Sequence, residues 1–286
     1  MTIGATVITR NDNYGGDLIF KLYYNLSCLL SSMDEVYLVD WNSPNDISTF
    51  EILKNMLPKT GKLHHIQITQ SKAKELTKQY NCTQKCVEVL ARNIGIRRLR
   101  TDYKLSVNAD IISLSRNSIT DKIIDDRTFH VVARREMNFY HAIGCEFTPG
   151  SEEFFNAMYD KHQLFNQHGD GSPLPNDPWS LITCCGDFQL AHSNIWNAIK
   201  GYEESLVLPG YTDSNIQKKA VLNGFNIALV RDIPVFHCIH YPNTGSSGGI
   251  GEVPQNDMNV SLIDFKETTN SDSWGFASIN FKEDIL

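Results

Sequence analysis

The sequence predicts an α/β fold, with a parallel sheet covered by helices on both faces. In the first 110 residues, short apolar runs rich in β-branched residues alternate with longer segments whose apolar residues recur at helical spacing. The connections between these segments are short, which is typical of parallel strands joined by right-handed crossovers. Since the sequence shows no internal repeat and no long linker, we expect one domain over residues 1–286.

The first half, residues 1–112, is expected to hold four strands and three helices. Each strand is a short apolar run closed by polar or turn-forming residues, and Pro58 stops the second helix. The third helix is expected to be the longest, and its apolar residues share one face. The expected strands are "ATVITR" (5–10), "EVYLVDW" (35–41), "KLHHIQIT" (62–69) and "YKLSVNADI" (103–111), and the expected helices cover 18–31, 49–57 and 82–100.

The second half, residues 113–242, follows a different pattern and includes an irregular stretch rich in Gly, Pro and Asn. An Asn-Gly pair at 223–224 is a good signal for the end of a helix. Residues 243–286 are expected to be a flexible loop and a C-terminal tail. The expected elements are a strand at 128–136, a strand followed by a helix within 184–204, a helix within 211–225 and two short strands within 226–242.

Composition excludes several classes of protein. A net charge of −7 argues against a general nucleic-acid binder, which needs a basic surface. Seven cysteines occur without a C-x-x-C pair, which indicates reduced thiols rather than a disulfide or zinc framework. No signal peptide precedes the first strand, and no apolar run approaches the ~20 residues that span a bilayer. We therefore expect a cytoplasmic protein with no transmembrane segment.

Three of the predicted strands end in side chains suited to ligand binding. Ligands of parallel sheets sit at the carboxyl ends of the strands, and these residues all lie there. Acids, amides and an arginine at three strand ends indicate a binding site rather than packing. The residues are Thr9 and Arg10 after the first strand, Asp40 and Trp41 after the second, and Asn108 and Asp110 after the fourth.

Asn108 and Asp110 are the first candidate metal site. Alternate residues of a strand point to the same face, so the two side chains project together. Two oxygen ligands side by side suit a hard divalent cation and leave positions for water and phosphate oxygens. The alternative is an Asx turn that caps the strand.

His237 and His240, in "VFHCIH", are candidate metal ligands at another strand end. Imidazole suits manganese and other transition ions better than calcium. A site of one carboxylate, one imidazole and diphosphate oxygens would combine these histidines with Asp110. The alternative is that both histidines are structural.

Asp213 and Arg92 are candidates for chemistry and anion binding. Asp213 stands in the first turn of a predicted helix, where it is either a simple cap or a general base. As a base it would deprotonate an acceptor hydroxyl attacking the anomeric carbon of a sugar bound to a diphosphate. Arg92, on the helix before the fourth strand, offers a fork of donors for a planar anion.

Taken in order, these segments resemble a nucleotide-sugar-dependent glycosyltransferase of the GT-A fold. "ATVITRND" is similar to the first strand and nucleotide loop of that fold, and "VYLVDWNSP" to a segment that touches the nucleoside. "ARNIGIRRLRTDYKLSVNAD" resembles the run ending in the DXD motif, with Asn108 in place of the first acid and Asp110 at the second. The resemblance implies a Rossmann-like mixed sheet, a nucleoside-diphosphate sugar donor such as a UDP-sugar, and Mn²⁺ or Mg²⁺.

The second half is similar to the galactosyltransferase-like branch of that fold. "CGDFQLAHSNIWNAIKGYEESLVLPGYTDSNI" places Asp213 on the catalytic base, although its neighbours depart from the acids of the family. "VFHCIH" falls on the strand whose last histidine binds metal, which favours His240, with His237 as a second ligand. Asp187 is expected on the acceptor side, where it binds acceptor hydroxyls or competes with Asp213 as base.

The resemblance divides the chain into a nucleotide-sugar-binding half (1–112) and an acceptor-binding half (113–242). It implies a metal-dependent hexosyltransferase acting on a glycan or another hydroxyl acceptor, with inversion because no second nucleophile is evident. A sugar-nucleotide pyrophosphorylase and a non-catalytic sugar-nucleotide or glycan-binding module are the alternatives. The implied nucleoside and phosphate site consists of Thr9, Arg10, Asp40, Trp41, Arg92 and Asn108.

Overall fold

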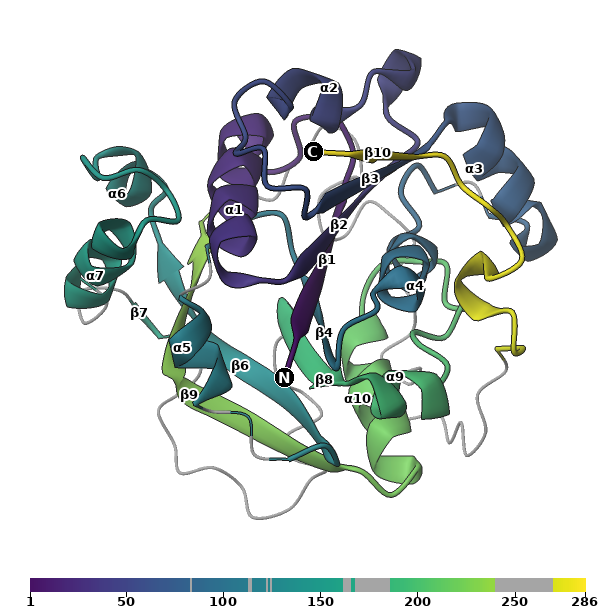
Figure 1. The fold of residues 1–286 in the computed structure, drawn as a ribbon. Coiled ribbons are helices and arrows are strands. Elements are labelled where there is room, and N and C mark those ends of the chain that lie inside the picture. Colours follow the sequence, from purple (N-terminus) through teal and green to yellow (C-terminus); the bar gives the residue numbers. More distant parts are fainter. Residues whose placement is uncertain are drawn as a thin grey trace.

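The fold was analysed in a computed structural model (Figure 1). The residues that the structure describes are 1–82, 84–112, 115–121, 123, 125–161, 166–167, 186–239 and 270–286.

Ten strands of the described residues form one mixed sheet, in the order β10-β3-β2-β1-β4-β8-β6-β9-β5, with β7 paired to β6. The expected α/β class is confirmed. The strands are β1 (Ile3–Thr9), β2 (Glu35–Trp41), β3 (Leu63–Ile68), β4 (Tyr103–Val107), β5 (Ile111–Ile112), β6 (Thr128–Met137), β7 (Asn166–Gln167), β8 (Phe188–His192), β9 (Asn226–Cys238) and β10 (Glu283–Ile285).

The parallel strands β3, β2, β1 and β4 form the half of the sheet that we expected from the first 112 residues. Every residue of β1 is buried, because β1 has a strand on each side and apolar layers on both faces. Thr9 pairs with Asp40 of β2, and Val7 pairs with Val107 of β4. The carboxyl ends of these strands therefore meet at one edge of the sheet, where a ligand is expected.

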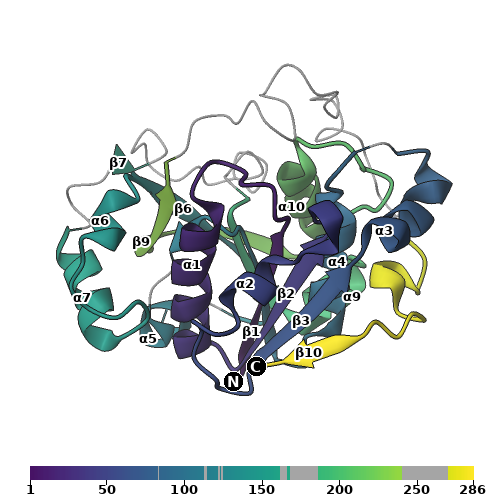
Figure 2. The same cartoon turned by 90° about the horizontal axis from the view of Figure 1, so that it is seen from above.

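Helices cover both faces of the sheet. Figures 1 and 2 show α1 on one side of β1 and α4 on the other. In the described parts of the chain, no helix combines the length and apolarity needed to cross a bilayer. The helices are α1 (Leu18–Ser32), η1 (Pro44–Asp46), α2 (Thr49–Leu53), α3 (Gln70–Thr77), η2 (Lys78–Tyr80), α4 (Glu88–Arg98), α5 (Arg116–Thr120), α6 (Tyr140–Ile143), α7 (Glu152–Lys161), α9 (Ser193–Ala198), α10 (Thr212–Leu222) and η5 (Trp274–Phe276).

Helix α4 approaches the sheet most closely at Gly95. A Cβ at this position would lie 1.9 Å from the Thr6 Oγ1 of β1, so only glycine fits between the two elements. This contact fixes the height of α4 above β1 and thereby the position of Arg92, one turn earlier on the same helix.

Several helix predictions differ from the structure. The long helix expected from residue 82 begins only at Glu88, and the helix expected over 49–57 ends at Leu53. Helices α3 (Gln70–Thr77) and α7 (Glu152–Lys161) were not expected. The Thr69 hydroxyl caps α3 by accepting a hydrogen bond from the Lys72 amide at 3.3 Å. Residues 84–86 instead line a cavity beside β1, so the helical spacing in this stretch was misleading.

The second half extends the sheet with β8, β6 and β9. Strand β8 runs antiparallel to both β4 and β6, whereas β6 and β9 are parallel. We expected two short strands over 226–242, but β9 is one strand of 13 residues. Its register against β6 shifts between the Val132–Val230 and Arg134–Val235 pairs, and Pro234 lies within this shift. The proline therefore marks an irregularity inside one strand.

The last 17 residues are packed on the domain, although we expected only a tail there. Trp274 is 1% exposed, and the Arg97 guanidinium of α4 lies 4.8 Å from its ring centroid. The Gly275 amide donates a hydrogen bond of 2.7 Å to Glu204 Oε1. Strand β10 then pairs antiparallel with β3 at the edge of the sheet. The remaining part of the expected loop, residues 243–269, lies outside the described residues.

Candidate functional site

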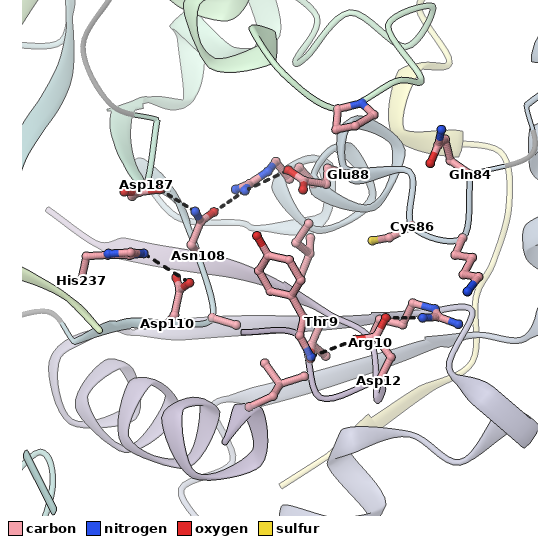
Figure 3. A pocket seen from close by; sticks show the side chains of 17 residues that line it. Thr9, Arg10, Asp12, Gln84, Cys86, Glu88, Asn108, Asp110, Asp187 and His237 are labelled. Atoms are coloured by element: carbon pink, nitrogen blue, oxygen red, sulfur yellow. Dashed lines mark hydrogen bonds and ion pairs between the residues drawn. The ribbon is translucent and has the colours of Figure 1, made fainter. Parts of the chain in front are cut away.

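A cavity of about 370 Å³ opens at the carboxyl ends of β1 and β4 (Figure 3). Its wall combines the loop after β1, the segment before α4, the loop between β4 and β5, and single residues of α4 and β9. The lining residues are Ile8, Thr9, Arg10, Asp12, Tyr14, Leu18, Gln84, Lys85, Cys86, Glu88, Arg92, Asn108, Ala109, Asp110, Asp187, Pro209 and His237.

Arg92, Asn108 and Asp187 form a hydrogen-bonded row in the cavity wall. Figure 3 labels Asn108 and Asp187. The Arg92 guanidinium donates to Ser106 Oγ at 2.8 Å and to Asn108 Oδ1. Asn108 Nδ2 in turn donates to Asp187 Oδ1 at 2.6 Å. The side chain at position 108 thus accepts on one side and donates on the other, which an amide does and an ionised carboxylate does not. This accounts for the asparagine at this position.

Asp110 and His237 form a second group, below this row in Figure 3. His237 Nε2 lies 3.5 Å from Asp110 Oδ2, and His237 Nδ1 lies 2.7 Å from Glu136 Oε2. Asp110 follows β4, Glu136 is on β6 and His237 is on β9, so three distant segments converge here. A carboxylate and an imidazole face each other beside the cavity.

The loop after β1 supplies the opposite wall. Arg10 is ion-paired with Asp12, and its Nε donates to the Asn42 carbonyl at 3.0 Å. Tyr14 also lines the cavity, and burial together with the charges of Glu88, Asp110, Asp187 and Asp12 raises its pKa to about 12. Its hydroxyl therefore stays protonated at neutral pH.

Comparison with known proteins bears on the fold. No protein-family model matches the sequence, and no curated protein matches it. The structure of GalNAc-T7 with UDP, GalNAc and Mn²⁺ matches with a TM-score of 0.55 and 14% identity, covering 84% of this chain and 44% of that one. The mannosyltransferase PcManGT from Pyrobaculum calidifontis, in complex with GDP-Man and Mn²⁺, matches with a TM-score of 0.52 and 14% identity, covering 83% and 57%. The fold is of the GT-A type.

A further match is S. aureus TarS 1-349, with 16% identity, a TM-score of 0.49 and coverage of 83% of this chain and 60% of that one. The chain thus spans 44% to 60% of the length of these solved chains. The expected GT-A fold, with its mixed sheet flanked by helices, is confirmed.

Within this GT-A fold, the expected donor site is brought together only in part. Thr9, Arg10, Arg92 and Asn108 all line the cavity, as does Asp110. The wall also contains residues that we did not predict, among them Asp12, Tyr14, Cys86 and Glu88. The Gly-rich turn "NDNYGG" was the available signal for Asp12 and Tyr14. Cys86 and Glu88 were missed because we expected the helix to begin at residue 82.

Asp40 and Trp41, which we expected in the donor site, lie outside the cavity wall. Asp40 is fully buried, and its carboxylate accepts hydrogen bonds from the Ser43 hydroxyl and from Thr49 N at 2.6 Å and Oγ1 at 2.8 Å. Burial raises the Asp40 pKa, and these hydrogen bonds oppose the increase. Asp40 holds the turn after β2, while Trp41 packs in the core with α3 and α4.

The structure describes two of the three predicted metal ligands. Asp110 and His237 offer one oxygen and one nitrogen, a donor set that suits manganese and leaves coordination positions for other oxygens. No group of three or more His, Cys, Asp or Glu side chains in the described part of the chain is arranged as a metal site. His240 lies outside the described residues. The two placed residues fit a cation that takes its other ligands from water or a bound anion.

Asp213 stands in the first turn of α10, behind the strand-end segment that carries Asp187. A Cβ on Gly186 would lie 2.1 Å from the Asp213 Cβ, so Gly186 allows α10 to approach this closely. Gln189 Nε2 donates to the Asp213 carbonyl at 3.4 Å. Burial raises the Asp213 pKa, and the nearby Asp187 charge adds to the increase. Asp213 is adjacent to the cavity wall but is not part of it.

The amide at position 108 gives a testable prediction. Asn108→Asp removes the donor to Asp187 and places two carboxylates in contact, so we expect the free energy of unfolding to fall by about 1–3 kcal/mol. The exchanged pair, Asn108→Asp with Asp187→Asn, restores one donor and one acceptor and should recover most of this loss. Urea denaturation of both single variants and the double variant measures the coupling energy. If the double variant loses at least as much unfolding free energy as the two single variants together, the assignment is contradicted.

Proposed function

We propose that this protein is a metal-dependent glycosyltransferase that transfers a sugar from a nucleoside diphosphate to an acceptor hydroxyl. The observation that carries the proposal is the Asp110–His237 pair, which borders a cavity at the carboxyl ends of parallel strands in a GT-A fold. The solved neighbours with TM-scores above 0.5 were crystallised with UDP or GDP-Man and with Mn²⁺, which supports this choice.

The donor diphosphate would bind where the cavity offers cationic side chains. Arg10, Lys85 and Arg92 line it, but Arg10 is paired with Asp12, and Arg92 with Asn108 and Glu88. A doubly charged cation on Asp110 and His237 would supply the missing positive charge and neutralise the leaving diphosphate. Mn²⁺ or Mg²⁺ is therefore proposed as the cofactor. Tyr14 is proposed to donate a hydrogen bond to an oxygen atom of the sugar nucleotide.

Asp213 is proposed as the base and Asp187 as a residue that contacts the acceptor. A buried carboxylate with a raised pKa is a stronger base than an exposed one, and it acts only when ionised. The rate is therefore expected to fall as the pH falls through this raised pKa. One base and no second nucleophile correspond to inversion at the anomeric carbon, and a glycan or another hydroxyl compound is the proposed acceptor.

Turnover of sugar nucleotides tests the proposal. We expect the purified protein to release nucleoside diphosphate from one class of sugar nucleotide, with Mn²⁺ present and not with EDTA. Coupled detection of the released diphosphate measures this rate across UDP-, GDP-, CDP- and dTDP-sugars. Binding of a sugar nucleotide without release, in the presence of Mn²⁺ and a panel of sugar acceptors, would contradict transfer and indicate a non-catalytic binding module.

A further inference from the structure

Glu136 on β6 lies beside His237 on β9, and neither the sequence pattern nor the comparisons assign it a role. The two residues face each other in the parallel β6–β9 ladder. His237 Nδ1 and Glu136 Oε2 are 2.7 Å apart, and the two side chains are only 10% and 20% exposed. This is a short, shielded contact between an imidazole and a carboxylate.

The contact fixes which nitrogen of the neutral ring carries the proton. An ionised carboxylate only accepts hydrogen bonds, so the hydrogen resides on Nδ1. Nε2 is then left with its lone pair, and this atom lies 3.5 Å from Asp110 Oδ2. A lone pair and a carboxylate oxygen repel each other unless a proton or a metal cation lies between them. The geometry thus presents two electron-pair donors to one point beside the cavity.

Backbone hydrogen bonds also fix the positions of Asp110 and His237. The Cys238 amide donates to the Asp110 carbonyl at 2.9 Å, and the Ile239 amide donates to the Met137 carbonyl at 2.8 Å. His237 is therefore tied to the Asp110 segment on one side and to β6 on the other. Rotation of the imidazole ring is the main freedom left, and the contact with Glu136 removes it.

We propose that Glu136 is a positioning residue that holds the His237 ring and its tautomer, so that Nε2 and Asp110 together bind a divalent cation. The inference rests on the proposed function and deepens it, because it adds a carboxylate that does not touch the metal. Removing a carboxylate that supports a metal-binding histidine typically weakens metal affinity about 10- to 100-fold.

Titration of the full chain with Mn²⁺, followed by the EPR signal of free Mn²⁺, tests this inference. We expect Glu136→Ala to weaken Mn²⁺ binding about 10- to 100-fold, and Glu136→Gln, whose amide oxygen still accepts from Nδ1, to retain most of the affinity. Glu75→Gln is the control, because it removes a carboxylate that is 64% exposed, ion-paired with Lys72 and outside the cavity wall. Its effect should stay below about threefold, since exposed charges are screened.

Competition with Mg²⁺ separates positioning from general damage. Magnesium depends less on imidazole than manganese does, so Glu136→Ala should weaken Mn²⁺ binding more than Mg²⁺ binding. Equal Mn²⁺ affinity in the wild type and Glu136→Ala, with His237→Ala weakened, would overturn the inference and leave the metal site intact. Unchanged affinity in Asp110→Ala and His237→Ala would overturn the metal site itself. If the alanine variant does not fold, Glu136→Asp replaces it, because its shorter side chain withdraws the carboxylate from Nδ1 and should likewise weaken Mn²⁺ binding.

Discussion

We expect Asp110→Asn to lower manganese-dependent turnover about 10³-fold, the largest effect of any single substitution. The change preserves the shape of the side chain but removes the charge that faces His237 across 3.5 Å. A catalytic metal contributes several kcal/mol to the stabilisation of charge in the transition state, which corresponds to about a 10³-fold loss of rate. The rate of nucleoside diphosphate release, at a Mn²⁺ concentration that just saturates the wild type, measures the loss.

The matched control is Asp126→Asn, which removes the same charge from an exposed position before β6. It should leave both the rate and the dependence on Mn²⁺ unchanged. If Asp110→Asn keeps the wild-type rate and the wild-type requirement for Mn²⁺, Asp110 is not a metal ligand. Restoration of the rate at high Mn²⁺ would instead show that the substitution weakened metal affinity, as the assignment requires.

Asp213→Asn is expected to lower turnover about 10²- to 10⁴-fold, the usual contribution of a general base. Donor affinity should change little, because Asp213 is not part of the cavity wall. The loss should therefore appear in kcat rather than in the Kd of the nucleotide. In the wild type, the rate is expected to fall at low pH because Asp213 becomes protonated. The remaining activity of the variant should not show this fall.

The stability of this variant provides the control for folding. The Asp213 pKa is raised in the folded protein, so the unfolded state loses its proton at lower pH than the folded state does. Wild-type stability therefore falls as the pH rises from the unfolded pKa to the folded pKa, and asparagine removes this loss. We expect Asp213→Asn to melt at the wild-type temperature or above it at neutral pH. Full turnover in this variant would show that another group, such as Asp187, is the base.

The first half of the site followed from simple rules. Parallel strands place their carboxyl ends together, so polar residues after β1 and β4 were expected to meet. Thr9, Arg10, Asn108 and Asp110 do line one cavity, together with Arg92 from the intervening helix. Spacing alone was sufficient for the first four, because each of them stands within a few positions of a strongly apolar strand.

The expectations that differ from the structure depend on contacts for which the sequence gives no clear pattern. Asp40 lies near the end of β2, but its carboxylate accepts hydrogen bonds from Ser43 and Thr49 of the following turn. Glu136 and His237 meet only because β6 and β9 pair in one register, for which the sequence carries no local signal. The packing of Trp274 on α4 likewise depends on a contact between residues far apart in the chain.

A thermal-shift screen with UDP, GDP, CDP and dTDP, each with Mn²⁺ and with EDTA, tests the central claim most directly. A ligand that binds only the folded state stabilises it by mass action, by about 2.7 kcal/mol at 100 times its Kd. For a chain of this size that corresponds to an increase in Tm of roughly 4–5 °C. We predict such a shift for one nucleotide, only with Mn²⁺, and its loss in Asp110→Asn. No shift with any nucleotide, or an equal shift in Asp110→Asn, would contradict a metal-dependent donor site in this cavity.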